Sequence, residues 1–412
     1  MKLQINLENL NIEPEKLEKH FGRAKNILQD LKQKNEPMTG WVKQPASLTE
    51  EMIADIEKTA EEIKSLCEVL VVIGVGGSYM GTACIEQALQ GSRPGYPELV
   101  YAGHNFSGNY LSDIVEIVQN KETCLCVVSK SGSTMETSIA FNVLKEALQI
   151  KYGDKSNKRI IAITDPESGK LRKEAIKEGY KTFPIPSDIG GRYSAFTAGI
   201  LFPLAVTGAD IRKFIKGASD IAVDSEFWEK EGLLYALARK ALLEAGKTVE
   251  VFEFYDPSLS LIGDWCEQLF GESEGKEGKG LFPAKMIFSR DLHSMGQFLQ
   301  EGNQIFFETM INVQNWDKDV VLPETEIARL SSGSLNEINK IAMEGVIAAH
   351  SKAGVPIILI EIEDSKEYCL GQLLYFFMMT AAVTGKLMGI NPFNQPGVEG
   401  YKSEIKERLG IK

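Results

Sequence analysis

Residues 127–137 read Val-Val-Ser-Lys-Ser-Gly-Ser-Thr-Met-Glu-Thr, and this stretch predicts a turn between a strand and a helix. The apolar run 124–128 leads into the turn as a buried parallel strand, and the amphipathic run 135–148 follows it as a helix. Four hydroxyl residues surround Lys130 in the turn: Ser129, Ser131, Ser133 and Thr134. A helix N-terminus adds free N–H groups and a partial positive charge. An ordinary N-cap needs only one hydroxyl, so the stretch favours a phosphate-sized anion site.

A second strand–turn–helix unit precedes this one in the chain. The apolar run 69–73 predicts a central strand, and Gly74-Val-Gly-Gly-Ser-Tyr-Met-Gly81 follows it. A dinucleotide-binding loop would need glycine where Tyr79 stands, so we do not expect NAD. The glycines nevertheless let backbone N–H groups approach a ligand closely, and Ser78 would open the next helix. Both turns should face the carboxyl edge of one parallel sheet, where ligands of open α/β sheets bind.

Strand and helix patterns alternate along most of the chain. Further strands are expected at 98–101 and 159–164, with helical runs between them, and the same alternation returns in the second half. It predicts two α/β sandwiches, each a parallel sheet with helices on both faces. We place an N-terminal helical arm at 1–47, a first domain at 48–187, a second at 188–390 and a polar helical tail at 391–412.

The composition restricts the classes of function. The 412 residues carry 45 Lys and Arg against 57 Asp and Glu, a net charge of −12, so no bulk positive field would attract nucleic acid. The six cysteines form no Cys-x-x-Cys pair, and His and Cys never cluster at ligand spacing. Reduced, buried thiols and no metal site are expected. Neither a signal-peptide core nor a run of 18 apolar residues occurs, which predicts a cytoplasmic protein without a membrane span.

The stretch Gln268-Leu-Phe-Gly-Glu-Ser-Glu-Gly-Lys276 could carry chemistry. Gln268 and Glu272 are four residues apart and would share one helix face. We expect Gly271 and Gly275 to end the helix and expose its acids. A solvated helix end is the alternative interpretation of Glu272, because it is the common position of a lone Glu.

Other candidates lie at the edges of predicted elements. Arg192, in Gly190-Gly-Arg-Tyr-Ser194 before an apolar helical run, could reach the ligand site of the first domain or lie on the surface. His293 follows a strand at the start of a helix, where it could act as acid or base, and His104 competes for that role. His20 and His350 have the pattern of surface or core-edge helix residues.

The last polar constellation is the stretch 391–402, Asn-Pro-Phe-Asn-Gln-Pro-Gly-Val-Glu-Gly-Tyr-Lys. Its Asn-Pro and Gln-Pro-Gly sequences predict a turn, after which Glu399 and Lys402 begin a helix. Lys402 could equally be one of many surface lysines.

Taken together, six stretches resemble, in order along the chain, the bacterial type of the glucose-6-phosphate isomerase (phosphoglucose isomerase) family. They are Gly74–Gly81, Ser129–Thr137, Gly190–Ser194, Gln268–Lys276, Asp291–Gly302 and Asn394–Lys402. The resemblance implies two sugar-isomerase (SIS) domains of αβα type with mainly parallel five-stranded sheets. It also implies a cytoplasmic homodimer with active sites between subunits, a hexose 6-phosphate substrate and no cofactor. The chain is short for the family, with a trimmed tail.

The resemblance also implies roles for individual residues. Glu272 would be the general base that moves a proton between C2 and C1 through a cis-enediol, and Arg192 would steady the enediolate. His293 would assist ring opening, and Lys402 would act from the C-terminal segment. The remaining positions would bind substrate: Gly77, Ser78, Ser129, Lys130, Ser131, Thr134, Gln268 and Gln395. Two alternatives stay open, a non-catalytic SIS sensor of a sugar phosphate and an isomerase of a related hexose phosphate such as mannose 6-phosphate.

Overall fold

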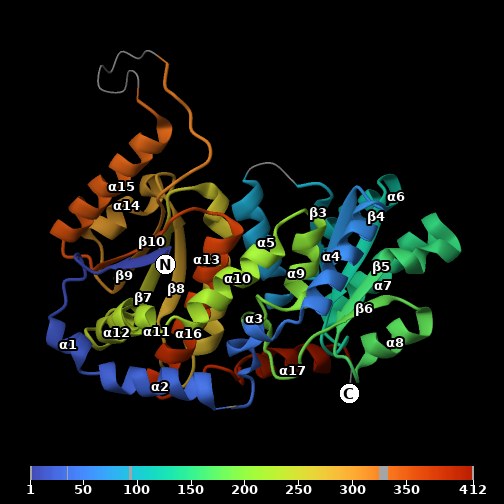
Figure 1. The fold of residues 1–412 in the computed structure, drawn as a ribbon, viewed down its shortest axis with the longest axis horizontal. Helices are drawn as coiled ribbons and strands as arrows, with labels where there is room; N and C mark the ends of the chain where they lie inside the picture. Colours follow the sequence, from blue (N-terminus) through green and yellow to red (C-terminus); the bar gives the residue numbers. More distant parts are fainter. Residues whose placement is uncertain (1, 35, 92–94, 324–332, 411–412) are drawn as a thin grey trace.

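Two five-stranded sheets organise the chain, the first on the right of Figure 1 and the second on the left. The computed structural model describes residues 2–34, 36–91, 95–323 and 333–410. The expected α/β architecture with mainly parallel five-stranded sheets is confirmed.

The first sheet is parallel throughout, in the order β3-β2-β4-β5-β6. Its strands are β2 (Val69–Ile73), β3 (Glu98–Ala102), β4 (Thr123–Val128), β5 (Ile160–Thr164) and β6 (Lys181–Pro184). The sequence pattern does not signal β6, which is short and ends in a proline. A proline is tolerated there because β6 is an edge strand.

Helices cover both faces of this sheet because its strands are apolar on both sides. Leu70 and Val72 face one core, whereas Val69, Val71 and Ile73 face the other. The helices on the first face are α4 (Glu50–Lys64), α5 (Gly77–Gln90) and α9 (Ala198–Val206). Those on the second face are α6 (Gly108–Asn120), α7 (Met135–Tyr152) and α8 (Lys170–Glu178).

The second sheet has the order β1-β10-β9-β7-β8, and only β1 is antiparallel. Its strands are β1 (Leu3–Asn6), β7 (Val249–Phe254), β8 (Phe282–Ile287), β9 (Phe306–Val313) and β10 (Ile357–Ile362). One face packs on α12 (Leu233–Glu244), α13 (Ser260–Glu274) and α16 (Glu367–Leu387). The other face packs on α14 (Leu292–Glu301) and α15 (Leu335–Lys352).

The N-terminal segment is more than a helical arm, which corrects the expectation for residues 1–47. Its strand β1 pairs with the open edge of β10, with Leu3 opposite Ile362. The backbone N–H and C=O groups of that edge thereby gain partners. The segment also contains two helices, α1 (Pro14–Glu18) and α2 (Phe21–Gln33).

The remaining helices lie between and beneath the sheets. They are α3 (Gln44–Ser47), α10 (Ile211–Val223), α11 (Ser225–Phe227) and the C-terminal α17 (Val398–Arg408). Helix α16 is long and apolar enough to cross a membrane, but 94% of its most apolar window is buried inside the fold. It is therefore a core helix, packed against one face of the second sheet. All six cysteines are unpaired and buried, as expected.

Candidate active site

The two turns singled out in the sequence leave the same edge of the first sheet. Strands β2 and β4 are neighbours, with Ile73 opposite Val127. The chain continues from β2 to β3 on one side and from β4 to β5 on the other. A crevice opens at such a reversal of strand order, which is where ligands of open α/β sheets bind.

The hydroxyl-rich turn after β4 is held by its own side chains and by backbone hydrogen bonds from Asp165 and Lys170, which follow β5. Ser129 Oγ accepts a hydrogen bond from the Gly132 N–H at 3.1 Å, and the hydroxyls of Ser131 and Ser133 lie 2.7 Å apart. Thr134 is the N-cap of α7, yet its hydroxyl makes no capping hydrogen bond. The first turn of α7 therefore has no side-chain cap at the place where an anion would bind. Lys130 donates to the carbonyl of Ser187.

Two glycines bring the turn after β2 against the second half of the chain. Gly76 has φ +56°, and a β-carbon there would lie 2.6 Å from Nε2 of Gln268. A β-carbon on Gly77 would lie 1.9 Å from the carbonyl oxygen of Gly191. The start of α5 thus touches both α13, which carries Gln268, and the 3-10 turn η3 (Gly191–Tyr193).

Arg192 is the centre of the site, and the alternative of a surface arginine is wrong. Only 3% of the residue is exposed. Its Nη1 donates to Glu272 Oε2 at 3.2 Å and to Gln395 Oε1 at 2.7 Å. Its Nε donates to Ser273 Oγ at 2.9 Å. The guanidinium therefore joins η3, the end of α13 and the C-terminal segment.

Glu272 lies in the last turn of α13 with 31% of its side chain exposed, so it can be reached by a ligand. The expectation that Gly271 and Gly275 end the helix and expose its acids is wrong for Glu274. The helix continues to Glu274, which is fully buried. The buried guanidinium of Arg239 binds both of its carboxylate oxygens, so the helix end turns inward.

Three residues of the site have no role in the sequence expectations. Ser273 accepts from Arg192 and lies 3.0 Å from the hydroxyl of Tyr193. Lys276, four residues after Glu272, donates to the carbonyl of Asn391. Each of these contacts joins segments at least 80 residues apart, so no local sequence signal could have found them.

His293 is not brought beside Glu272 within one chain. His293 lies at the start of α14, next to the carboxyl end of β8, and is exposed. Helix α13 begins at the same sheet edge, and Glu272 is twelve residues further on, roughly 18 Å along the helix.

Of the other three histidines, only His104 has a described contact with a residue of the glycine turn, Tyr79, which follows Ser78. His104 stacks on Tyr79, His20 lies 3.0 Å from Glu244, and His350 is buried 2.7 Å from Glu308.

The C-terminal segment reaches the site only in part. Gln395 contacts Arg192, whereas Lys402 lies in α17, which has no buried residue. Lys402 Nζ donates a hydrogen bond to Oε1 of Glu399, three residues earlier in the chain, at 3.3 Å. Helix α17 runs along the bottom of the molecule in Figure 1.

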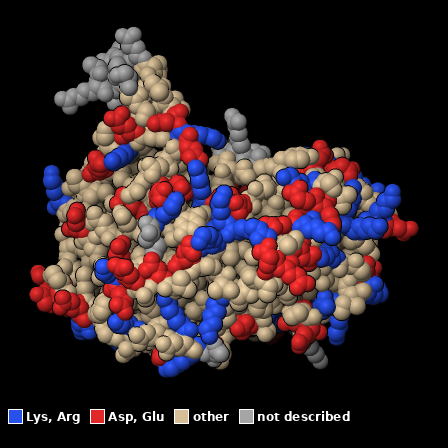
Figure 2. Space-filling model, in the orientation of Figure 1, with Lys and Arg blue, Asp and Glu red and all other residues tan. Residues whose placement is uncertain are grey.

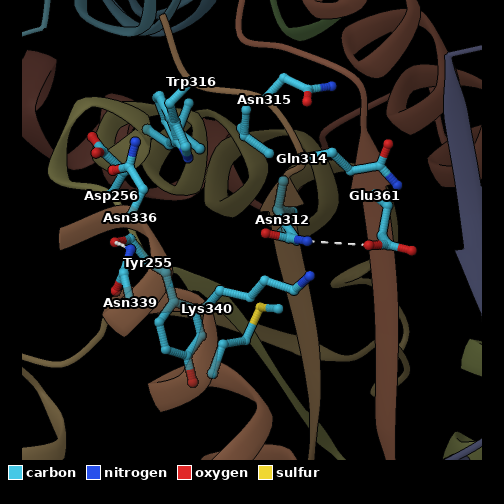
Figure 3. A pocket seen from close by; sticks show the side chains of 14 residues that line it. Tyr255, Asp256, Asn312, Gln314, Asn315, Trp316, Asn336, Asn339, Lys340 and Glu361 are labelled. Atoms are coloured by element: carbon cyan, nitrogen blue, oxygen red, sulfur yellow. Dashed lines mark hydrogen bonds between the residues drawn. The ribbon is translucent and has the colours of Figure 1, made fainter. Parts of the chain in front are cut away.

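A separate cavity of about 440 Å³ lies at the carboxyl ends of β7 and β9 in the second sheet (Figure 3). Tyr255, Trp316 and Lys340 are among its lining residues, and Asn312 donates there to Glu361 at 3.1 Å. No residue proposed for the site from the sequence lines this cavity.

Residues 19–280 match a family model described as phosphoglucose isomerase. The chain belongs to the phosphoglucose isomerase family. The matched range contains both turns of the first sheet, Arg192 and Glu272, and it ends before His293, Gln395 and Lys402.

Individual relatives agree with the phosphoglucose isomerase assignment. The glucose-6-phosphate isomerase of Acetivibrio thermocellus is 42% identical over 388 residues, covering 90% of this chain and 87% of the relative. That of Lactobacillus helveticus is 43% identical over 380 residues, covering 89% and 85%. The crystal structure of a glucose-6-phosphate isomerase from Chlamydia trachomatis superposes with a TM-score of 0.85 at 20% identity, covering 99% of this chain and 88% of that one. This last likeness shows that the fold is shared.

Proposed function

We propose that Arg192 and Glu272 form the reaction centre of an aldose–ketose isomerase, with Glu272 as general base. The chain catalyses the reversible isomerisation of D-glucose 6-phosphate and D-fructose 6-phosphate. The 3.2 Å contact between Arg192 Nη1 and Glu272 Oε2 carries the proposal. It places a partly exposed carboxylate beside a buried cation at the junction of the two domains.

The residues suit a proton transfer through an enediol. After ring opening, Glu272 would remove the proton from C2 of the aldose and return it to C1 of the ketose. Arg192 would offset the negative charge that develops on the enediolate oxygen. A positioned base typically contributes about 10²–10⁴-fold to the rate. Gln268 and Gln395, which flank the pair, would orient the open chain.

The turn after β4 supports the phosphate end of the substrate. We assign the phosphate to Ser129, Ser131 and Thr134, with Lys130 alongside, because Thr134 leaves the start of α7 uncapped. Gly77 and Ser78 would line the sugar. The glycine turn after β2 lies between the hydroxyl-rich turn and α13. It contacts α13 at Gln268.

We also propose a homodimer whose active sites are shared between subunits. His293 needs a route to Glu272 that one chain does not provide. Helix α14, which carries His293, exposes the apolar side chains Met295 and Phe298 to 38% and 44%. A second copy packed on α14 would cover this surface and could bring His293 to the base of its partner. In the same way, Lys402 would join the site only after α17 shifts or meets the partner.

The remaining expectations stand as part of the proposal. The proposed boundaries near 47, 187 and 390 separate the strands of the two sheets, except that β1 joins the second sheet. Helix α9 follows residue 187 but packs on the first sheet. On the face shown in Figure 2, basic side chains lie interspersed with acidic ones. Together with the net charge of −12, this distribution supports a cytoplasmic enzyme that binds a small sugar phosphate, with no nucleic acid or membrane as partner.

A coupled assay tests the reaction and separates the alternatives. Purified protein is given fructose 6-phosphate with EDTA present, and mannose 6-phosphate is offered in parallel. Turnover of the glucose–fructose pair alone supports the proposal. Turnover of mannose 6-phosphate instead would reassign the substrate. Phosphate-ester binding without turnover would favour a sensor, which needs the hydroxyl-rich turn but no base.

A further inference from the structure

The segment Asn391–Gln395 crosses the site without the support of a sheet or helix. Pro392 lies within it and Pro396 follows it, and neither residue has a backbone N–H. Phe393 anchors its middle, with its ring 5.6 Å from that of Tyr193. Within the segment, the Phe393 N–H donates to the Asn391 side-chain oxygen at 2.9 Å. The backbone carbonyls of Asn391, Pro392 and Asn394 instead accept from donors in other parts of the chain.

Two cations supply those donors. Arg192 Nη2 donates to the carbonyls of Pro392 at 2.6 Å and Asn394 at 3.1 Å, and its Nη1 donates to the Gln395 side chain. Lys276 Nζ donates to the carbonyl of Asn391. Four oxygens of one short segment are thus held by one buried arginine and one half-buried lysine.

The surroundings of Lys276 tie it to the reaction centre. Burial and the nearby Arg192 guanidinium lower the pKa of Lys276 to about 8, although the carboxylates of Glu272 and Glu277 act in the opposite direction. Arg192 comes from η3, Glu272 from the last turn of α13 and Glu277 from the loop after it. The Lys276 ammonium therefore interacts electrostatically with both Glu272, the proposed base, and Arg192.

We propose that Lys276 is a positioning residue that, together with Arg192, clamps the segment Asn391–Gln395 onto the end of α13. The clamp fixes the positions of Gln395 and the Arg192 guanidinium around Glu272. This inference rests on the proposed function of the site. Between Pro396 and Gly410, the described part of the chain beyond Gln395, no residue is buried. Loss of the Lys276 contact would free the segment on the Asn391 side and let Arg192 follow it.

The test compares Lys276→Met with Lys279→Met as the matched control. Lys279 lies in the same loop and is paired only with Glu277, at 3.4 Å, among the described contacts. We expect Lys276→Met to lower kcat about tenfold to a hundredfold, the value of a charge-assisted hydrogen bond. The inhibition constant of sorbitol 6-phosphate, which cannot isomerise, should stay unchanged because the hydroxyl-rich turn is untouched. Lys279→Met should leave both values unchanged.

Lys276→Arg provides the conservative rescue. It keeps the charge and the donors, so it should recover most of the kcat lost in Lys276→Met. The wild-type rate should fall on the alkaline side as Lys276 loses its proton near pH 8. Because arginine keeps its proton, Lys276→Arg should move that fall to higher pH. A fall that stays in place would overturn the role of Lys276.

Amide hydrogen exchange tests the clamp without using activity. Residues 393–397 should exchange faster in Lys276→Met than in the wild type, and Lys279→Met should match the wild type. Equal exchange and equal kcat in the two methionine variants would overturn the inference. An inactive wild type would instead overturn the proposed function, while the exchange comparison would still report on the clamp. If Lys276→Met does not fold, Lys276→Gln keeps a neutral donor and replaces it in both measurements.

Discussion

Gly77 lies so close to Gly191 that a β-carbon on residue 77 would come within 1.9 Å of the Gly191 carbonyl oxygen. The start of α5 therefore rests directly on the turn that carries Arg192. We expect Gly77→Ala to push the two apart, because a backbone atom cannot yield as a flexible side chain can. Misplacement by about 1 Å typically costs about a hundredfold in rate, and overpacking costs about 1–3 kcal/mol of stability.

The matched control for this change is Gly108→Ala at the start of α6, where a β-carbon meets nothing within 4 Å. Steady-state kinetics and thermal unfolding of both variants make the comparison. Wild-type kinetics in Gly77→Ala would show that the contact between α5 and η3 does not position Arg192.

Glu272→Gln should leave the fold intact and remove the base. The side chain is partly exposed and its amide can still accept from Arg192, so the melting temperature should change little. Turnover should fall by at least about 10²–10⁴-fold. Glu267→Gln on the same helix is the control, because that carboxylate lies near Asp264 and Lys285 instead. Near-normal turnover in folded Glu272→Gln would end the assignment of the base.

Arg192→Ala separates transition-state stabilisation from phosphate binding. Its contacts are with Glu272, Ser273 and the C-terminal segment, and none is with the turn after β4. We expect kcat to fall much more than the affinity for sorbitol 6-phosphate. The reverse result would make Arg192 a phosphate ligand. Kinetics and inhibitor titration at one pH measure both values.

Mixed dimers test whether His293 acts on the partner's Glu272. Glu272→Gln and His293→Ala should each be nearly inactive alone. If sites are shared, unfolding and refolding an equal mixture should give hybrid dimers with one intact site, and about a quarter of wild-type activity. If each chain builds its own site, every site in the mixture lacks one residue and no activity returns. Size-exclusion chromatography checks that the refolded species is dimeric.

Glu253 predicts a pH dependence of stability that is independent of the active site. It is fully buried near Glu308 on neighbouring strands, and burial followed by that carboxylate raises its pKa well above 4.5. Tyr255 and the His350–Glu308 pair face the same cluster. When folding raises the pKa of a carboxyl group, the unfolded chain loses that proton at a lower pH than the folded chain. Rising pH therefore favours the unfolded state. The free energy of unfolding should therefore fall as pH rises above about 4.5, by up to about 1.4 kcal/mol per pH unit.

Glu253→Gln removes this titration while keeping the size of the side chain. Chemical denaturation between pH 5 and 8 should show a flatter profile and a higher stability at pH 8 than the wild type. Glu361→Gln, at a partly exposed carboxylate of β10, is the control and should keep the wild-type slope. An unchanged slope in Glu253→Gln would mean that another group carries the dependence.

Much of the fold could be read from local pattern. The apolar runs 69–73 and 124–128 are strands, and the spacing of Gln268 and Glu272 does place them on one helix. Local pattern could not predict contacts between residues that are far apart in the sequence. The strand β1 could not be expected from four residues of ordinary polarity, because it forms only where the edge of β10 offers partners. The inward turn of Glu274 likewise depends on Arg239, which lies 35 residues earlier.

The sequence by itself determined the α/β alternation, the hydroxyl-rich turn after β4 and the membership of the phosphoglucose isomerase family. Those features are local, since they depend on periodicity, turn chemistry and residue type at short spacing. The tertiary structure alone decided that Arg192 is buried against Glu272 and Gln395, and that His293 lies away from both in one chain. Contacts between residues 80 to 203 positions apart have no local signature, because they arise only when the elements of both sheets and the C-terminal segment pack together.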